Sequence, residues 1–255
     1  MKTILLPFAL IAVMFTSCKK NTFNLVEKQS KTTPVDTTIT SDKVIDNFIA
    51  PFRTHLNKTL DSTLAYAPET YNKKDYGINR ALNTAIGNFM ADVVYKQAQP
   101  IFKSRTKLDI DAVLLNHGGI RSVISKGPIS ARTAYQVMPF ENSIVIAKLK
   151  KPEMDSLLNY LVTERKAHPI SNMNLILNKD YSIKELNINH KPIENRAYYV
   201  ATSDYLATGG DRMNFFKAAD TIYNINYKIR NSLIDYFNKV DTIRPKIDNR
   251  FIKLN

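Results

Sequence analysis

Residues 202–211 combine side chains that can recognise a flat molecule bearing neighbouring hydroxyls. The run holds an aromatic ring, two adjacent glycines and a carboxylate, which are Tyr205, Gly209, Gly210 and Asp211. Paired glycines turn tightly and let the backbone approach a ligand, because they lack a Cβ. A ring can stack on a planar group, and a carboxylate can accept hydrogen bonds from two hydroxyls. A planar ring joined to a vicinal diol describes a nucleoside, although a buried Tyr, a glycine turn and a capping Asp would give the same pattern.

Two further runs, 116–121 and 137–142, again combine a turn with side chains suited to binding. The first follows the apolar stretch 112–115, which is typical of a buried strand. The amides, aromatic ring, guanidinium and turn glycines of these runs are Asn116, Gly118, Gly119, Arg121, Phe140 and Asn142. Arg carries a rigid fork of donors that suits carboxylate or phosphate. Because loops at strand ends commonly carry binding residues, the three runs together predict one binding site.

The elements that would position these loops alternate irregularly between helix and strand. Apolar residues at helical spacing predict helices over 42–62, 84–97, 130–137, from Pro152 onwards and over 227–238. Short apolar or alternating runs predict strands at 112–115, 143–149, 174–177, 183–188 and 198–202. Asn83 is the expected N-cap of the second helix. This order predicts a mixed α/β (α+β) fold in which helices pack against a mixed sheet.

The N-terminal residues predict export and a lipid anchor. Residues 1–17 carry Lys2, an apolar core too short to span a membrane, and a small residue before Cys18, the single cysteine. This pattern resembles a bacterial lipoprotein signal peptide with Cys18 as the lipidated N-terminus, and an ordinary signal peptide is the alternative. Residues 18–41 are polar and predict a disordered tether. Residues 42–255 then form the folded domain, placed at the cell envelope and held to the membrane only through lipid.

A formal net charge of +13 is compatible with binding to nucleic acid, anionic lipid or anionic metabolites. The Lys and Arg residues are scattered, however, and no RNA-binding or helix-turn-helix signature is present. We therefore expect a solvated basic surface and no nucleic-acid partner.

The motifs resemble, in order, the C-terminal substrate-binding domain of the bacterial and animal 5′-nucleotidases, a family that includes UDP-sugar hydrolases and 2′,3′-cyclic phosphodiesterases. The matching pieces are Arg80 before 86–92, then 116–121, 127–130, 139–142, 203–211 and 229–236. The similarity covers residues 42–254. It implies the fold of that domain and a nucleotide or nucleoside ligand.

The resemblance assigns roles to seven substrate-binding residues, which are Arg80, Asn116, Arg121, Phe140, Asn142, Tyr205 and Asp211. It implies that Phe140 and Tyr205 stack on the base from opposite faces, with Tyr205 where the family often has Phe. Core burial is the alternative for either ring, and Tyr205→Phe is expected to be nearly silent because the stacking surface is kept. Asn142 would bind the base edge.

The same resemblance places Asp211 on the ribose hydroxyls and the two arginines near ribose and phosphate. A helix N-cap is the alternative for Asp211, and a structural ion pair is the alternative for Arg80 or Arg121. Asn116 and the glycines at 118, 119, 209 and 210 would shape the loops, and His117 is expected to fill its loop without a catalytic role.

The sequence contains no recognisable motif for the metal ligands that hydrolysis would need. In the family, an N-terminal metallophosphatase domain holds two divalent metal ions that generate hydroxide. This chain has four histidines and no Asp-x-His, Gly-Asn-His-Asp, Gly-Asn-His-Glu or Gly-His-x-His motif. No catalytic residue, metal ligand or cofactor is therefore expected within this chain. A Ser-His-Asp triad is not excluded by composition, but no motif positions one.

Three functions are compatible with this sequence. The first is the nucleotide-recognising half of a split 5′-nucleotidase, whose two metal ions reside in a separately encoded metallophosphatase. The second is an envelope lipoprotein that binds nucleosides or nucleotides without hydrolysis. The third is reuse of the scaffold for protein contacts or cell-wall attachment. An adjacent gene for a stand-alone metallophosphatase would favour the first.

Overall fold

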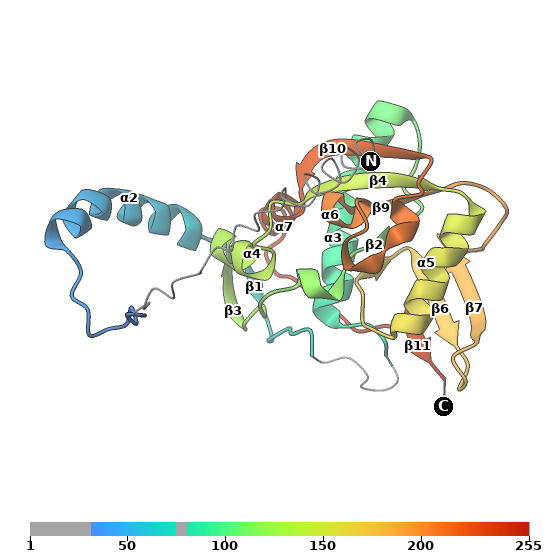
Figure 1. The fold of residues 1–255 in the computed structure, drawn as a ribbon, viewed down its shortest axis with the longest axis horizontal. Helices are drawn as coiled ribbons and strands as arrows, with labels where there is room; N and C mark the ends of the chain where they lie inside the picture. Colours follow the sequence, from blue (N-terminus) through green and yellow to red (C-terminus); the bar gives the residue numbers. More distant parts are fainter. Residues whose placement is uncertain (1–31, 75–80, 255) are drawn as a thin grey trace, which may run out of the picture. The chain divides into compact units, whose positions relative to one another are not determined.

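The computed structural model describes residues 32–74 and 81–254 (Figure 1). Residues 49–255 form one compact unit, and residues 1–48 are assigned to a second unit. Arg80, Cys18 and the predicted signal peptide lie outside the described residues, so those predictions stay untested. Six α-helices are present in the described part of the chain, α2 to α7, and its strands form three sheets.

The largest sheet lies in the middle of the compact unit. Within the described residues its order is β10 (Thr221–Lys228), β4 (Ser143–Leu149), β9 (Tyr198–Ser203), β2 (Ala112–Leu114) and β5 (Ile170–Ser171). The pair of β2 and β9 is parallel, and the other neighbouring pairs are antiparallel. The sheet is therefore mixed, as the sequence predicts.

Successive residues of the central strands point into two different hydrophobic cores, since side chains alternate across a sheet. Val113 packs in a core with α3 (Ala85–Thr106) and α7 (Ile229–Phe237). Leu114 packs in a second core with α5 (Lys151–Glu164). The central strands are consequently buried on both faces, which explains their nearly continuous apolar sequences.

A second sheet covers α5 and the second core. Its order is β11 (Phe251–Lys253), β6 (Met173–Leu177), β7 (Ile183–Ile188) and β8 (Lys191–Pro192). A smaller sheet pairs β1 (Thr63–Ala67) with β3 (Gly127–Ser130), next to α4 (Ala131–Val137). Figure 1 shows β6 and β7 beside α5, and β1 and β3 beside α4.

Most predicted elements are present within two residues of their expected bounds, including α2 (Lys43–Asp61), α4, β4, β7 and β9. The N-cap prediction for α3 is wrong. Thr84 caps the helix by accepting a hydrogen bond from the Gly87 N–H at 3.0 Å. Helix α3 also continues past the predicted end through Pro100 to Thr106. A proline removes one helical hydrogen bond, and burial of Phe102 beyond it favours continuing the helix.

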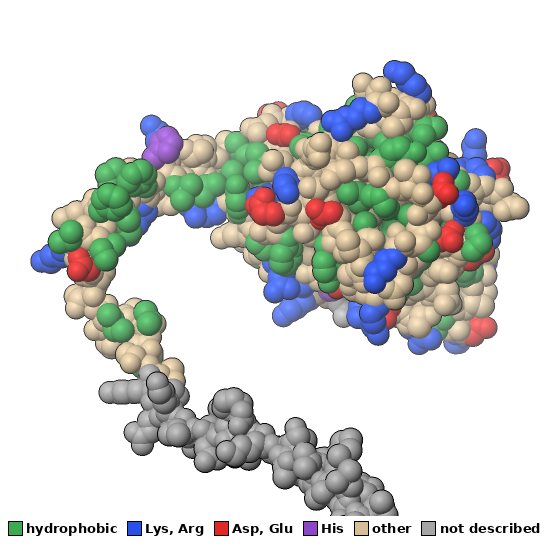
Figure 2. Space-filling view, turned by 45° about the horizontal axis from the view of Figure 1, so that its top comes forward, with side chains coloured by type: hydrophobic (Ala, Val, Ile, Leu, Met, Phe, Trp, Pro, Cys, Tyr) green, Lys and Arg blue, Asp and Glu red, His purple; other side chains and the backbone are tan. Residues whose placement is uncertain are grey.

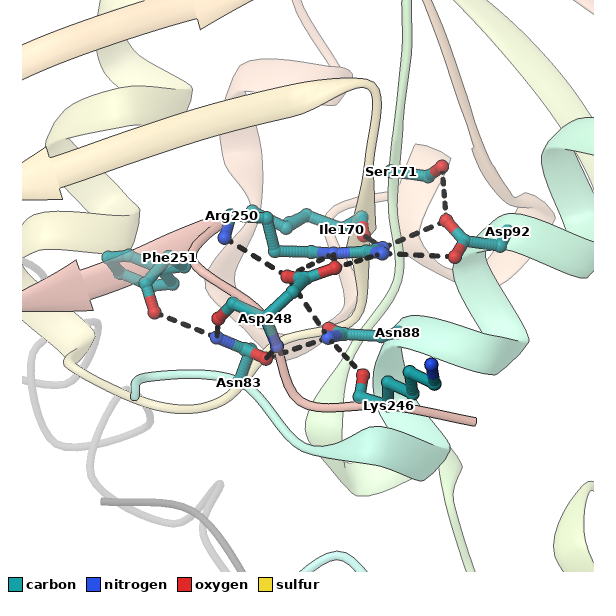
Figure 3. A network of polar contacts seen from close by, with 9 residues as sticks. All are labelled: Asn83, Asn88, Asp92, Ile170, Ser171, Lys246, Asp248, Arg250 and Phe251. Atoms are coloured by element: carbon teal, nitrogen blue, oxygen red, sulfur yellow. Dashed lines mark hydrogen bonds and ion pairs between the residues drawn. The ribbon is translucent and has the colours of Figure 1, made fainter. Parts of the chain in front are cut away.

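Asn83 instead anchors the C-terminal segment to the start of α3 (Figure 3). Its Nδ2 donates to the carbonyl oxygens of Asp248 and Phe251, each at 2.9 Å. Arg250 extends the network, because its guanidinium contacts both carboxylate oxygens of Asp92, at 2.8 and 3.0 Å. A side chain used in this way is unavailable as a helix cap.

Helix α2 is amphipathic, as predicted, but none of its residues is buried. Near its end, Asp61 forms an ion pair with Arg132 of α4 at 2.5 Å. No helix among the described residues is long and apolar enough to cross a membrane. On the face shown in Figure 2, Lys and Arg side chains are spread over the compact unit and interspersed with Asp and Glu.

Candidate functional site

A cavity of about 330 Å³ brings the three predicted loops together. The residues that line it are Asn116, Gly118, Gly119, Arg121, Phe140, Asn142, Tyr205 and Asp211. Six of the seven predicted substrate-binding residues therefore surround one cavity, and the seventh, Arg80, lies outside the described residues. The cavity lies where β2 and β9 end and where β4 begins.

The first loop leaves the end of β2 and forms a short 3₁₀ turn, His117–Gly119. A Cβ at Gly119 would lie 2.7 Å from Oδ1 of Asn116, so the close packing of this amide requires glycine there. The Arg121 N–H donates to the Val137 carbonyl at 2.9 Å, which joins the first loop to the end of α4. These contacts hold Asn116 and Arg121 at the cavity.

The second loop carries Phe140, and Arg230 of α7 holds its backbone in place. The Arg230 side chain, in a residue only 4% exposed, donates to the carbonyls of Pro139 and Phe140 at 3.2 and 3.4 Å. It also pairs with the carboxylate of Glu141, and this hydrogen bond lowers the pKa of Glu141. Arg230 was not among the predicted site residues, although it lies in the motif at 229–236.

The third loop begins at α6 (Asp204–Ala207) and turns at Gly209, whose φ is +88°. A Cβ at Gly210 would lie 2.4 Å from Cε1 of Tyr205, so the backbone at this glycine lies against the tyrosine ring. The predicted tight turn agrees with this geometry, and the predicted close approach to a ligand stays a prediction. The observed close approach is to a side chain of the chain itself.

Asp211 is the centre of a hydrogen-bond network inside the cavity. Its Oδ2 accepts from Nδ2 of Asn116 at 2.7 Å, and its Oδ1 accepts from the hydroxyl of Tyr205 at 3.1 Å. Asp211 lies within a 3₁₀ turn, Gly210–Arg212, and a second 3₁₀ turn, Asn214–Phe216, follows. Neither turn has a hydrogen bond from a capping side chain. The helix-cap alternative is therefore wrong for the Asp211 carboxylate. Each carboxylate oxygen keeps capacity to accept a further hydrogen bond.

The Tyr205 hydroxyl thus has a specific partner, which changes the expectation for Tyr205→Phe. That substitution keeps the stacking surface but removes one hydrogen bond that orients Asp211. The Asp211 N–H also points to this hydroxyl, at 3.3 Å. Tyr205→Phe is therefore expected to weaken ligand binding through Asp211.

The two aromatic rings are exposed at the cavity, with residue exposures of 40% for Phe140 and 45% for Tyr205. Core burial is therefore wrong for both. The guanidinium of Arg121 lies 5.8 Å from the centroid of the Phe140 ring, within the range of a cation–π interaction. The Asn142 amide makes no side-chain hydrogen bond to the rest of the described chain.

The side chains of Tyr160 and His168 hold the turns at Asp211 and at His117 in place. The Tyr160 hydroxyl of α5 donates to the Asp211 carbonyl at 3.0 Å. The His117 N–H donates to Nδ1 of His168 at 3.3 Å. Burial is the main cause that lowers the pKa of His168 to about 4 and raises that of Tyr160 to about 12. Both side chains are consequently neutral at neutral pH, and His168 can accept this hydrogen bond.

His117 contacts His168 and is not among the residues that line the cavity. Its Nδ1 lies 3.2 Å from the Ala167 carbonyl oxygen, and burial lowers the pKa of the ring. This agrees with the expectation that His117 fills its loop. Tyr160 and His168 were not predicted, because no motif in the sequence places either of them near the loops.

Comparison with known proteins identifies the family. A family model described as 5′-nucleotidase, C-terminal domain, matches residues 65–218, which is more than half of the chain. The chain belongs to this family. The resemblance in the motifs is thereby confirmed.

Individual relatives of the 5′-nucleotidase C-terminal domain family match at low identity. Protein UshA of Escherichia coli is 31% identical over 109 residues, which cover 40% of this chain and 19% of UshA. The trifunctional nucleotide phosphoesterase protein YfkN of Bacillus subtilis is 26% identical over 187 residues, covering 67% of this chain and 12% of YfkN. The matches therefore span less than a fifth of either relative.

Solved structures confirm the fold of the family domain. The 5′-nucleotidase precursor of Thermus thermophilus superposes with a TM-score of 0.66 at 19% identity, over 83% of this chain and 43% of that protein. The NAD nucleotidase of Haemophilus influenzae gives a TM-score of 0.63 at 15% identity, over 84% of this chain and 42% of that one. The mixed α/β prediction is confirmed at the level of fold.

Proposed function

We propose that this chain is the nucleotide- or nucleoside-recognising half of a split 5′-nucleotidase-type phosphoesterase that acts in nucleotide catabolism or scavenging at the cell envelope. The observation that carries the proposal is the cavity itself, where two exposed rings and a hydrogen-bonded carboxylate surround one space. Membership of the 5′-nucleotidase C-terminal domain family and similarity to the nucleotide phosphoesterase YfkN support the ligand class.

Each part of the cavity matches one part of a nucleotide. Phe140 and Tyr205 offer faces on which a base can stack, and the Asn142 amide can hydrogen-bond the base edge. Asp211 can accept from the two ribose hydroxyls, because Asn116 and Tyr205 already orient its carboxylate. Arg121 can hold a phosphate by its guanidinium. Arg80 is proposed to assist near ribose or phosphate.

The described residues do not fit the two metal ions of a metallophosphatase. They contain no group of three or more His, Cys, Asp or Glu side chains that could hold a metal ion. We therefore derive no hydrolytic step within this chain and assign the metal ions to a separately encoded metallophosphatase. The same observation supports the second candidate, an envelope lipoprotein that binds nucleotides without hydrolysing them.

Calorimetry and phosphate release together test the proposal. The full chain is expected to bind adenosine monophosphate and to release no phosphate with manganese, zinc or cobalt present. Adding a metallophosphatase encoded beside it should give phosphate release that falls with Phe140→Ala in this chain. Binding without any such gain would favour the second candidate. Metal-dependent release by this chain alone, unchanged by Phe140→Ala and Asp211→Ala, would contradict the split-enzyme proposal.

We propose lipid attachment at Cys18 as the means of membrane association. In a host that processes lipoproteins, Cys18→Ala is expected to move most of the protein from the membrane fraction to the soluble fraction. The reason is that removal of the thiol prevents acylation, and stable anchoring depends on acyl chains. Immunoblots of the two fractions measure the shift, with Lys19→Ala as a control that keeps Cys18. Equal membrane association of the wild type and Cys18→Ala would contradict lipid anchoring at this residue.

A further inference from the structure

A second cavity, of about 490 Å³, adjoins the first at Arg121. Its lining combines three cationic side chains with small polar ones, and consists of Thr70, Asn72, Lys73, Lys74, Arg121, Ser122 and Val123. Arg121 is the residue common to the two cavities. Arg121 can therefore contact a ligand in either cavity.

Backbone pairing fixes the residues of this second cavity in place. Tyr71 and Ile124 form an antiparallel bridge, with N–H···O=C distances of 2.8 and 3.0 Å in the two directions. Beyond this bridge, the Lys126 N–H donates to Oγ1 of Thr70 at 3.1 Å. The bridge is the reason that Lys73 lies next to Arg121, although 47 positions separate Lys73 from Ile120.

The Lys73 ammonium is partly buried and has a defined position. It donates to the Ile120 carbonyl at 2.7 Å, beside the backbone of Arg121. Burial lowers the pKa of Lys73 most, and repulsion from Arg121 and Lys74 lowers it further. Within residues 32–74 and 81–254, none of these three cations forms an ion pair with a carboxylate.

Three cations that lie close together, with no ion-paired carboxylate among the described residues, favour an anion of more than one charge. A Lys ammonium acts as a point charge and an Arg guanidinium as a fork, and both bind phosphate oxygens well. A ligand with a single carboxylate carries one negative charge and would balance only one of the three cations. The wall residues Thr70 and Ser122 add hydroxyls that can donate to phosphate oxygens.

We propose that Lys73 and Lys74, together with Arg121, form a second anion subsite that takes a phosphate group beyond the one held in the first cavity. The phosphate is either the outer phosphate of a nucleotide or a free inorganic anion. The first source rests on the proposed function, because it requires a nucleotide in the neighbouring cavity. The second source does not.

Calorimetry on the full chain separates the two sources. Adenosine diphosphate is expected to bind about tenfold more tightly than the monophosphate, since one charge-assisted contact is worth about that factor. Lys73→Met should abolish this ratio and leave adenosine binding unchanged. Pyrophosphate, which has no base, should bind to the wild type and about tenfold more weakly to Lys73→Met. Lys74→Met, at an exposed side chain, repeats the test if Lys73→Met unfolds.

Lys191→Met is the matched control, because Lys191 is exposed in β8 and lies outside both cavities. It should leave the diphosphate ratio and pyrophosphate binding unchanged. Lys73-dependent pyrophosphate binding without any binding of adenosine monophosphate would keep the anion subsite and reject the proposed function. Equal affinity for mono- and diphosphate, with pyrophosphate binding unaffected by Lys73→Met and Lys74→Met, would overturn the subsite.

Discussion

Asp211→Ala is expected to weaken adenosine binding by roughly 10- to 150-fold and to leave 2′,3′-dideoxyadenosine almost unchanged. Hydrogen bonds to an ionised group contribute about 1.5–3 kcal/mol, and the dideoxy sugar offers the carboxylate no donor. The carboxylate is oriented for this role, because Asn116 and the Tyr205 hydroxyl each bind one of its oxygens, at 2.7 and 3.1 Å. Calorimetry with the two nucleosides measures the difference.

A second substitution separates binding from backbone strain at this position. Asp211 has a φ of +51°, in the left-handed region that Asp and Asn tolerate better than Ala. Asp211→Asn should therefore retain the melting temperature of the wild type, whereas Asp211→Ala should lower it. An amide accepts through one oxygen only, so Asp211→Asn should still lose ribose affinity. Equal weakening of both nucleosides by Asp211→Asn would show that Asp211 does not contact the ribose.

The sequence predicts the helices and strands whose apolar spacing is regular. Met154, Leu157, Leu158 and Leu161 mark one buried face of α5, and all four are buried in the structure. The strand predicted at 174–177 matches β6, whose residues alternate between buried and half-buried. These elements are predictable because burial of one face imposes a period on the sequence.

Strand β10 was missed, although its sequence alternates. Its pairing with β4 is interrupted between Asn224 and Lys228, and Asn226 has a φ of +54°. The larger residues Tyr223, Ile225 and Tyr227 nevertheless alternate with Asn224, Asn226 and Lys228, so a strand signal was present over 223–228. The sequence instead predicted a helix from 227, and the observed helix α7 begins two residues later, at Ile229.

The residues that face the candidate site were predictable, but the side chains that hold the loops in place were not. Motif order identified Phe140, Tyr205 and Asp211, and the structure brings them to one cavity. Arg230 and Tyr160 hold the same loops from positions 90 and 51 residues away along the chain. Sequence spacing carries no information on such distant contacts, and neither residue type is unusual in a helix.

The stacking residues give the other large expected effect. Phe140→Ala or Tyr205→Ala should weaken binding of adenosine and of 2′,3′-dideoxyadenosine alike, by roughly 5- to 150-fold. Stacking of a base on an aromatic side chain contributes about 1–3 kcal/mol and does not depend on the sugar. Tyr66→Ala is the matched control, because Tyr66 is 44% exposed, close to the 45% of Tyr205, and lies outside the cavity.

Tyr205→Phe distinguishes the ring from its hydroxyl. The ring remains, so dideoxyadenosine affinity should stay within about twofold of the wild type. Adenosine affinity should fall by about fivefold, because Asp211 loses the hydrogen bond from Tyr205 that orients it. Equal, strong weakening of both nucleosides by Tyr205→Phe would mean that the hydroxyl contacts the base directly. No effect of Tyr205→Ala on either nucleoside would remove Tyr205 from the binding site.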